Sequence, residues 1–116
     1  MKPIRKEKVQ ALIDRFAGKD LYIHLETTNG AYASHRDPSF LSAGAFIRNA
    51  AIRYEYGKIA GEGPYRVGLK MKDGWIYGEG LTHYELDERG RLLMAGHDDK
   101  GRLAVALELS PEPFEI

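Results

Sequence analysis

The sequence predicts a mainly β protein of the α+β class, in which one N-terminal helix is followed by an antiparallel meander that forms a barrel or a sandwich. Apolar residues recur with a helical period before Gly18 and with a period of two after it. Turn signals follow at intervals of roughly 8 to 12 residues, which is typical of short antiparallel strands. The segments between these turns are too short for the helical crossovers of a parallel sheet.

The helix is expected near the N-terminus, with Pro3 in its first turn and Gly18 just after its end. Four apolar residues spaced at i, i+3, i+4 and i+7 form its expected core-facing side: Val9, Leu12, Ile13 and Phe16. A basic amphipathic helix that lies on a membrane is the alternative interpretation. The small number of large apolar residues argues against it.

The remaining elements are strands separated by turns. The dipeptides Asn29-Gly30 and Asp73-Gly74 each indicate a hairpin, and both glycines are expected at positive φ because a type I′ turn requires it. A long β-favouring stretch from Ala45 to Ile59 is interrupted at Asn49-Ala50-Ala51 by a turn or a bulge. The other expected strands are Leu21–Glu26, Tyr65–Met71, Trp75–Leu81, Thr82–Leu86, Arg91–Gly96 and Leu103–Leu109.

Length and composition limit the class of protein. A chain of 116 residues is expected to form a single domain, 1–116, and 43% hydrophobic residues argue against disorder. The 17 basic and 17 acidic residues give zero net charge, which argues against a nucleic-acid partner. Cysteine is absent, so disulfides, thiolate metal sites and thiol nucleophiles are excluded. No apolar run approaches the roughly 20 residues of a membrane helix, so we expect a cytoplasmic protein with no membrane partner and no cofactor.

The first hairpin predicts a candidate site on its polar face. With the turn at residues 29–30, His24 lies opposite His35, and Glu26 lies opposite a small alanine. Tyr22 shares this face because side chains alternate across a strand. His24, Glu26 and His35 then have the composition of a two-histidine, one-carboxylate metal site. A ligand-contacting polar face and a plain solvated or oligomer-facing strand are the alternatives.

The second hairpin predicts a separate surface on which charged and aromatic side chains share one face. With Asp73-Gly74 as the turn, Lys70 lies opposite Tyr77, and Gly68 lies opposite Glu79. The residues expected to contact a ligand here, by stacking and cation–π interaction, are Arg66, Lys70, Trp75 and Tyr77. The favoured alternative is cross-strand pairing that only stabilises the sheet.

Motifs that would identify an enzyme are missing from the sequence. There is no phosphate-binding glycine motif that opens a helix, no zinc-protease motif and no nucleophile elbow. His97, Asp98 and Asp99 directly precede Lys100-Gly101, where a turn favours aspartate, so we assign them to that turn. No catalytic residue is therefore assigned.

Four segments spread along nearly the whole chain carry a resemblance to a known family: His24–Tyr32, Gly63–Lys70, Gly74–Tyr77 and Ala104–Leu109. In these segments the sequence resembles the YojF-like family of uncharacterised bacterial proteins. The resemblance implies no established activity and no catalytic residues. Members of this family tend to be encoded beside a zinc-dependent deacetylase of low-molecular-weight thiol metabolism, which implies an accessory or small-molecule-binding role.

These observations favour a non-catalytic protein that binds a small molecule or serves as an accessory protein. A metal-dependent enzyme that uses His24, Glu26 and His35 is the alternative, and a structural partner of another protein is a third interpretation. We also expect a homo-oligomer, most commonly a dimer. One helix cannot cover all the aromatic side chains of this sequence, and zero net charge removes a barrier to self-association.

Overall fold

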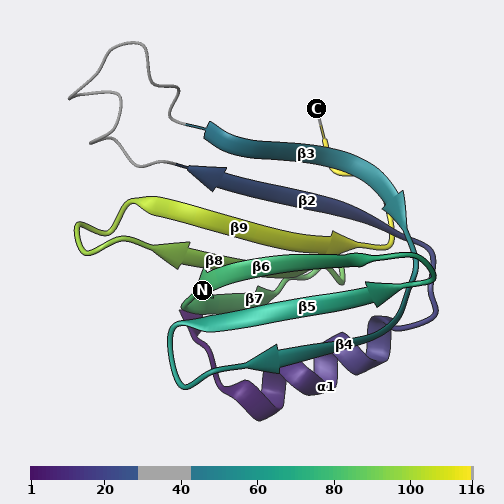
Figure 1. The fold of residues 1–116 in the computed structure, drawn as a ribbon, viewed down its shortest axis with the longest axis horizontal. Helices are drawn as coiled ribbons and strands as arrows, with labels where there is room; N and C mark the ends of the chain where they lie inside the picture. Colours follow the sequence, from purple (N-terminus) through teal and green to yellow (C-terminus); the bar gives the residue numbers. More distant parts are fainter. Residues whose placement is uncertain (29–42, 116) are drawn as a thin grey trace.

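Two antiparallel sheets and one helix make up the structure, a computed structural model that describes residues 1–28 and 43–115 (Figure 1). The larger sheet has the strand order β1-β7-β8-β9-β2-β3, and the smaller has the order β4-β5-β6. The elements are β1 (Lys2–Pro3), α1 (Lys6–Phe16), β2 (Leu21–Thr28), β3 (Ala43–Ile52), β4 (Tyr54–Ala60), β5 (Tyr65–Met71), β6 (Trp75–Leu81), β7 (His83–Leu86), β8 (Leu92–His97) and β9 (Leu103–Ser110). The prediction of a mainly β protein with one N-terminal helix and antiparallel pairing is confirmed.

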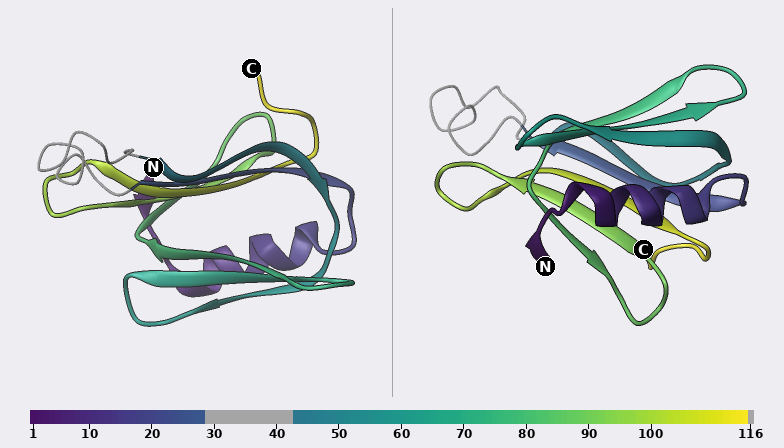
Figure 2. Two further views of the ribbon diagram at one scale, coloured as in Figure 1. Left: turned by 45° about the horizontal axis from the view of Figure 1, so that its top comes forward. Right: turned by 90° about the horizontal axis from the view of Figure 1, so that it is seen from below.

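The sheets pack on each other in a sandwich-like arrangement and do not close into a barrel (Figure 2). Strand β6 lies against β8 and β9, and glycines set the distance between them. A Cβ atom on Gly96 would lie 1.9 Å from the carbonyl oxygen of Gly80, and one on Gly78 would lie 2.9 Å from the Leu107 side chain. The chain is also not one continuous meander, because β9 pairs with β8 on one side and with β2 on the other.

The helix begins at Lys6, later than the sequence predicts. Pro3 lies in β1 opposite His83, because the N-terminus first adds a short strand to the edge of the larger sheet. The expected core-facing side is correct. Val9 and Ile13 are fully buried, and Leu12 and Phe16 are partly buried. Gly18 follows the helix with φ +77°, as expected for a residue after a helix end.

Helix α1 covers the free edge of β4, the outermost strand of the smaller sheet (Figure 1). The Gln10 Nε2 donates to the Gly57 carbonyl at 2.9 Å, and the Gln10 Oε1 accepts from the Ile59 N–H at 3.0 Å, so one side chain satisfies two backbone groups of the strand edge. A Cβ atom on Gly57 would lie 2.6 Å from Ile13, so glycine permits this close approach. The Tyr54 hydroxyl donates to the Ile13 carbonyl at 2.5 Å, and burial raises the pKa of Tyr54.

The long β-favouring stretch forms two strands that belong to different sheets. The chain leaves the larger sheet at Arg53, between β3 and β4, and not at residues 49–51. The interruption at Asn49 is a bulge inside β3, where φ is 62° and the register against β2 shifts. Of the two predicted alternatives, the bulge is therefore correct and the turn is wrong, because β3 pairs with β2 on both sides of Asn49.

Among the described residues, no helix has the length and apolar character that a membrane span requires.

We expect the substitution Ile13→Ala to lower the free energy of unfolding by about 2–5 kcal/mol, because it removes a fully buried side chain beneath β4. Urea unfolding measures the loss. Lys8→Ala, on the exposed side of the same helix, should change stability by no more than about 0.5 kcal/mol. Equal losses for the two variants would contradict the packing of α1.

Candidate functional site

The partner of β2 differs from the one that the sequence predicts. His24 lies opposite Arg48 of β3, and Glu26 lies opposite Phe46. The hairpin that placed Glu26 opposite an alanine and His24 opposite His35 is therefore wrong in register, and His35 itself lies outside the described residues. The Asn-Gly dipeptide is a local signal, whereas pairing with β3 depends on the whole sheet.

Both ring nitrogens of His24 have partners in the sheet. Nε2 lies 3.2 Å from the Glu26 carboxylate, and Nδ1 lies 3.2 Å from Nη1 of Arg48. Because a guanidinium only donates, Nδ1 must accept, and the imidazole proton lies on Nε2 and is donated to Glu26. The side chain is 6% exposed, between the rings of Phe46 and Phe114. This geometry fixes the tautomer and the orientation of the ring.

The same contacts bear on the metal hypothesis. His24 and Glu26 are brought together, but they bond to each other, and Arg48 brings a positive charge to the second nitrogen of His24. A metal ion at His24 would have to displace one of these partners. Within residues 1–28 and 43–115, no group of three or more histidine or carboxylate side chains is placed to hold a metal ion. The triad with His35 stays a prediction.

The C-terminal segment covers this polar cluster. The Asn49 amide donates to the Phe114 carbonyl at 2.8 Å and accepts from the Phe114 N–H at 2.6 Å. The guanidinium of Arg48 lies over the Phe114 ring, 4.9 Å from its centroid, and donates to the main-chain carbonyl of Glu115. Phe114 is 4% exposed as a result. Asn49 therefore has two roles: it adopts the positive φ of the bulge, and its amide binds the tail.

Glu108 of β9 completes the cluster on the other side of His24. Burial raises the pKa of Glu108, and the nearby positive charges of Arg48 and Arg91 only partly offset this effect. Of the residues that surround His24, only Glu26 was predicted from the sequence as a site residue. A further signal existed only for Glu108, whose carboxylate lies among the apolar residues of Leu103–Leu109.

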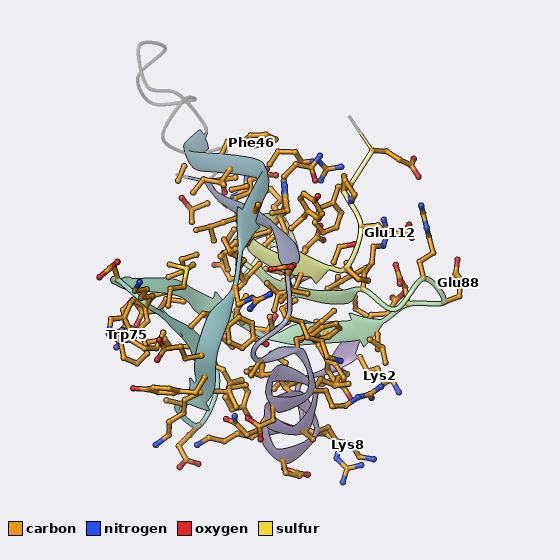
Figure 3. All side chains as sticks on the ribbon, turned by 90° about the vertical axis from the view of Figure 1, so that its right-hand side faces the viewer. Lys2, Lys8, Phe46, Trp75, Glu88 and Glu112 are labelled. Atoms are coloured by element: carbon orange, nitrogen blue, oxygen red, sulfur yellow. The ribbon has the colours of Figure 1, made fainter. Side chains whose placement is uncertain are left out.

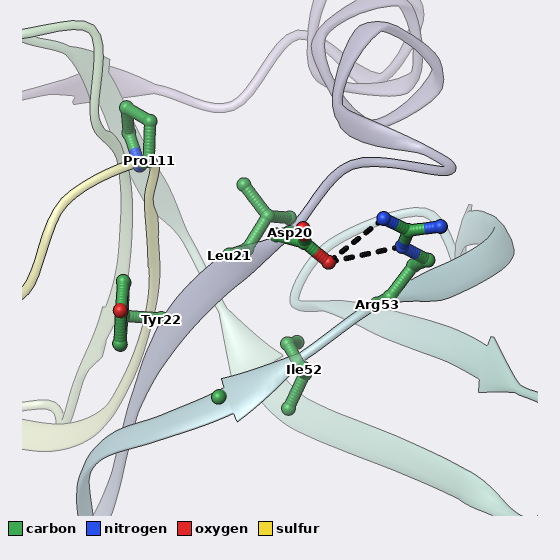
Figure 4. Close-up of a pocket in the computed structure, with 7 residues that line it drawn as sticks. Asp20, Leu21, Tyr22, Ile52, Arg53 and Pro111 are labelled. Carbon is green, nitrogen blue, oxygen red and sulfur yellow. Dashed lines mark hydrogen bonds and ion pairs between the residues drawn. The ribbon is translucent and has the colours of Figure 1, made fainter.

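Tyr22 shares the outer face of β2 with His24 but lies at a different place, beside an open pocket at the end of the strand (Figure 4). The charged groups of this pocket, Asp20 and Arg53, form an ion pair at 2.9 Å and are both exposed. The pocket is also lined by Ala51 and Pro111. Tyr22 therefore lines a pocket that neither His24 nor Glu26 lines.

The second hairpin has the predicted faces but not the predicted register. Gly74 has φ +90°, which confirms that part of the prediction, whereas Gly30 lies outside the described residues. Lys70 lies opposite Trp75, and Gly68 lies opposite Tyr77, two positions away from the predicted pairs. The reason is that the turn lies one residue earlier, at Lys72-Asp73, where the Met71 N–H donates to the Gly74 carbonyl at 3.0 Å. A shift of two residues leaves every side chain on its own face.

The outer face of the smaller sheet carries three exposed aromatic rings, Tyr56, Trp75 and Tyr77, which we call the aromatic face. Trp75 stacks against Tyr77 with centroids 5.6 Å apart and 8° between the planes, and Tyr56 meets Trp75 edge-on at 5.6 Å. A Cβ atom on Gly68 would lie 2.8 Å from the Tyr77 ring, so this glycine provides space for the ring on the sheet. Trp75 and its neighbours stand on the opposite side of the molecule from the tail (Figure 3).

Of the charged residues predicted for this face, Arg66 joins the aromatic rings and Lys70 does not. The Arg66 guanidinium lies 5.5 Å from the centroid of the Tyr77 ring and bonds to Glu79 at 2.6 Å. The Lys70 ammonium donates to main-chain carbonyls of the turn, at Met71 and Lys72. Tyr56 was not predicted as a site residue, because a register shift between Tyr54 and Tyr56 puts these two tyrosines on opposite faces of β4.

Asp98 and Asp99 lie in the predicted turn, whereas His97 is the last residue of β8 and pairs with Leu103, so its assignment to the turn is wrong. Asp98 accepts hydrogen bonds from the N–H groups of Lys100 and Arg102 and from the Arg102 guanidinium. The backbone bond from Arg102 is the main cause that holds the pKa of Asp98 below its usual range. His97 lies beside His83, with ring centroids 5.4 Å apart, a contact between β7 and β8 that the sequence did not indicate.

Comparison with known proteins identifies the family. Residues 3–114 match the family described as "Protein of unknown function (DUF1806)". The chain belongs to this family. It is 53% identical to "Uncharacterized protein YojF" of Bacillus subtilis (strain 168) over 116 residues, which is 100% of both chains. The crystal structure of Bacillus subtilis YojF protein superposes with a TM-score of 0.84 at 51% identity and covers 99% of this chain and 97% of that one. The resemblance inferred from the sequence is confirmed.

The raised pKa of Glu108 predicts a pH-dependent effect of the substitution Glu108→Gln. A carboxyl group with a raised folded-state pKa stabilises the fold below its unfolded-state pKa and loses this contribution as the pH rises through the folded-state value. Glutamine does not ionise. The stability of the variant relative to the native protein should therefore increase as the pH rises above about pH 4, the unfolded-state pKa of a glutamate, as measured by urea unfolding at each pH. The exposed Glu88→Gln variant should show no such trend.

We expect Asn49→Gly and Asn49→Ala to separate the two roles of Asn49. Both variants lose the bonds to Phe114, so the Phe114 amide should exchange with solvent faster in both. Only alanine adds backbone strain at φ 62°, by about 1 kcal/mol. Hydrogen exchange and urea unfolding measure these effects. Unchanged exchange at Phe114 would contradict the role of Asn49 in holding the tail.

Proposed function

We propose that this chain is a non-catalytic, cytoplasmic protein that binds a small molecule at its aromatic face. The finer assignment, an accessory role in low-molecular-weight thiol metabolism, comes from the family resemblance and is part of the same proposal. The observation that carries the binding function is the contact among Tyr56, Trp75 and Tyr77. These side chains are 53%, 42% and 51% exposed although they touch one another.

A contiguous exposed aromatic group differs from scattered exposed residues, which need no explanation. Single apolar side chains on a protein surface are common, but rings that stack on each other in solvent form a platform for a flat or ring-shaped ligand. Aromatic side chains also lose little conformational entropy on binding. Here Gly68 already holds the Tyr77 ring on the sheet, which reduces this cost further.

The charges near the platform support recognition by stacking. Glu79 neutralises Arg66, and Lys70 is directed to the turn, so the face has no strong unpaired charge among these three groups. A ligand held here would be a ring-containing compound of low net charge, with polar edges that reach Arg66 or Glu79. Stacking and cation–π contacts of this kind each contribute about 0.5–1.5 kcal/mol.

The same arrangement supports a function other than catalysis. The polar side chains that an enzyme would use are bonded to one another: His24 to Glu26 and Arg48, and Arg66 to Glu79. The metal-dependent alternative would require His24 to release Glu26 or Arg48. No contact in the described residues favours that release.

Trp75 is the single tryptophan of the chain, so its fluorescence reports directly on the proposed site. We expect a ring-containing compound, among a panel of low-molecular-weight thiols, nucleosides and sugars, to change the emission of Trp75 in a saturable manner. Tyr77→Ala should weaken that binding by about tenfold, since it removes one stacking surface.

Tyr22→Phe, on the larger sheet, is the matched control and should bind as the native protein does. A panel that leaves Trp75 emission unchanged up to millimolar concentrations would count against the proposal. Equal binding by the Tyr77→Ala variant would place the ligand elsewhere.

A further inference from the structure

Strand β3 is the outermost strand of the larger sheet, and no described segment pairs with its outer edge. It is ten residues long, Ala43–Ile52, and nearly all of the side chains described along it are exposed. Phe46 is 61% exposed on one face and Ile47 is 41% exposed on the other. A long apolar edge strand presents free N–H and C=O groups that form a template for another strand.

The other sheet edges of this protein are protected, which sets β3 apart. The opposite edge of the larger sheet is β1, which is only two residues long. The free edge of β4 is covered by α1, and Gln10 satisfies its Gly57 carbonyl and its Ile59 N–H. Strand β6, at the far edge of the smaller sheet, lies against β8 and β9. Short strands and covered edges are the usual devices against edge pairing. Strand β3 is ten residues long, and within residues 1–28 and 43–115 no segment pairs with its outer edge.

The sequence of β3 also lacks the charges that normally block an edge. It contains no proline, lysine or carboxylate, and Arg48 is its single charged residue. The Arg48 guanidinium is directed to His24 and to the Glu115 carbonyl. The register against β2 shifts at Asn49 and again between Ala43 and Ala45, so the regular part of the strand is Ala45–Arg48. This part carries apolar side chains on both faces, with Phe46 on one and Ile47 on the other.

We propose that β3 pairs antiparallel with β3 of a second copy of this chain, so that two larger sheets become one continuous sheet across a two-fold axis. A second copy fits because an antiparallel pair of identical strands is self-complementary. Residues opposite each other in a sheet point to the same face. In a symmetric pair of β3 strands, the residue at the two-fold axis must therefore lie opposite the same residue of the second copy. An axis at Ile47 puts Phe46 opposite Arg48 of the second copy and keeps the two arginines from facing each other. The zero net charge of the chain gives no long-range repulsion.

This interface is independent of the proposed ligand site. Phe46 and Trp75 lie at separate places in Figure 3, because β3 belongs to the larger sheet and the aromatic face to the smaller one. The pairing of one strand buries less than the roughly 800 Å² per partner of a standard interface, so the dimer is expected to dissociate on dilution. Dimer formation leaves the aromatic face open.

Light scattering coupled to gel filtration tests the proposal. The native protein should have a mass of twice 13.1 kDa at high concentration and should approach 13.1 kDa on dilution, over a range of about 1 to 500 µM. Ile47→Lys, an inward-pointing charge at the edge, should remain at the monomer mass throughout. The control is Tyr77→Lys on the aromatic face, which should dimerise as the native protein does.

Amide hydrogen exchange of the native protein provides a second measurement that needs no variant. The β3 amides should exchange more slowly at high concentration than at low concentration, while those of β5 should not change. Phe46→Lys replaces Ile47→Lys if the latter does not fold, as judged by circular dichroism. A monomer mass at every concentration would overturn the proposal. So would a larger oligomer, a dimer that survives both β3 variants, or a dimer that is lost in Tyr77→Lys alone.

Discussion

The contact between Gly80 and Gly96 determines how the two sheets are arranged. No side chain fits between these backbones, since a Cβ on Gly96 would lie 1.9 Å from the Gly80 carbonyl oxygen. Strand β6 can therefore rest directly on β8 and β9. The inner faces of both sheets become buried around this contact, and Leu69 and Leu107 are fully buried. The same placement leaves the aromatic face outside, and it leaves β3 at the uncovered end of the larger sheet (Figure 2).

Several polar side chains have structural roles, because they form hydrogen bonds within the fold. Gln10 completes the edge of β4, and Asn49 holds the tail over His24. His24 is satisfied on both nitrogens, so its cluster functions as a closed hydrogen-bonded unit beneath Phe114. Buried polar groups with complete partners stabilise one arrangement of a core. The two surfaces that we propose for recognition, the aromatic face and the edge of β3, are instead apolar and aromatic.

A predicted sheet face remains correct when the register error is an even number of residues, because side chains alternate between the two faces. In the second hairpin the pairs moved by two residues, and Trp75 and Tyr77 stayed on the face where the alternation had placed them. In the first hairpin the partner strand itself was different, so Arg48 lies where His35 was expected. In β4 a register shift of one residue separated Tyr54 from Tyr56, and simple alternation fails there.

Local patterns determined the helix, its buried side, the positive φ of Gly18 and Gly74, and most strand bounds, because each depends on neighbouring residues of the chain. The family is also determined by the sequence. The tertiary structure decided which strands pair, that β9 lies between β8 and β2, and that Arg48, Glu108 and Phe114 surround His24. It also decided that no described segment pairs with the outer edge of β3, and that three aromatic rings touch. These features depend on contacts between residues far apart in the sequence. A local sequence pattern does not determine which distant residues make the most favourable contacts.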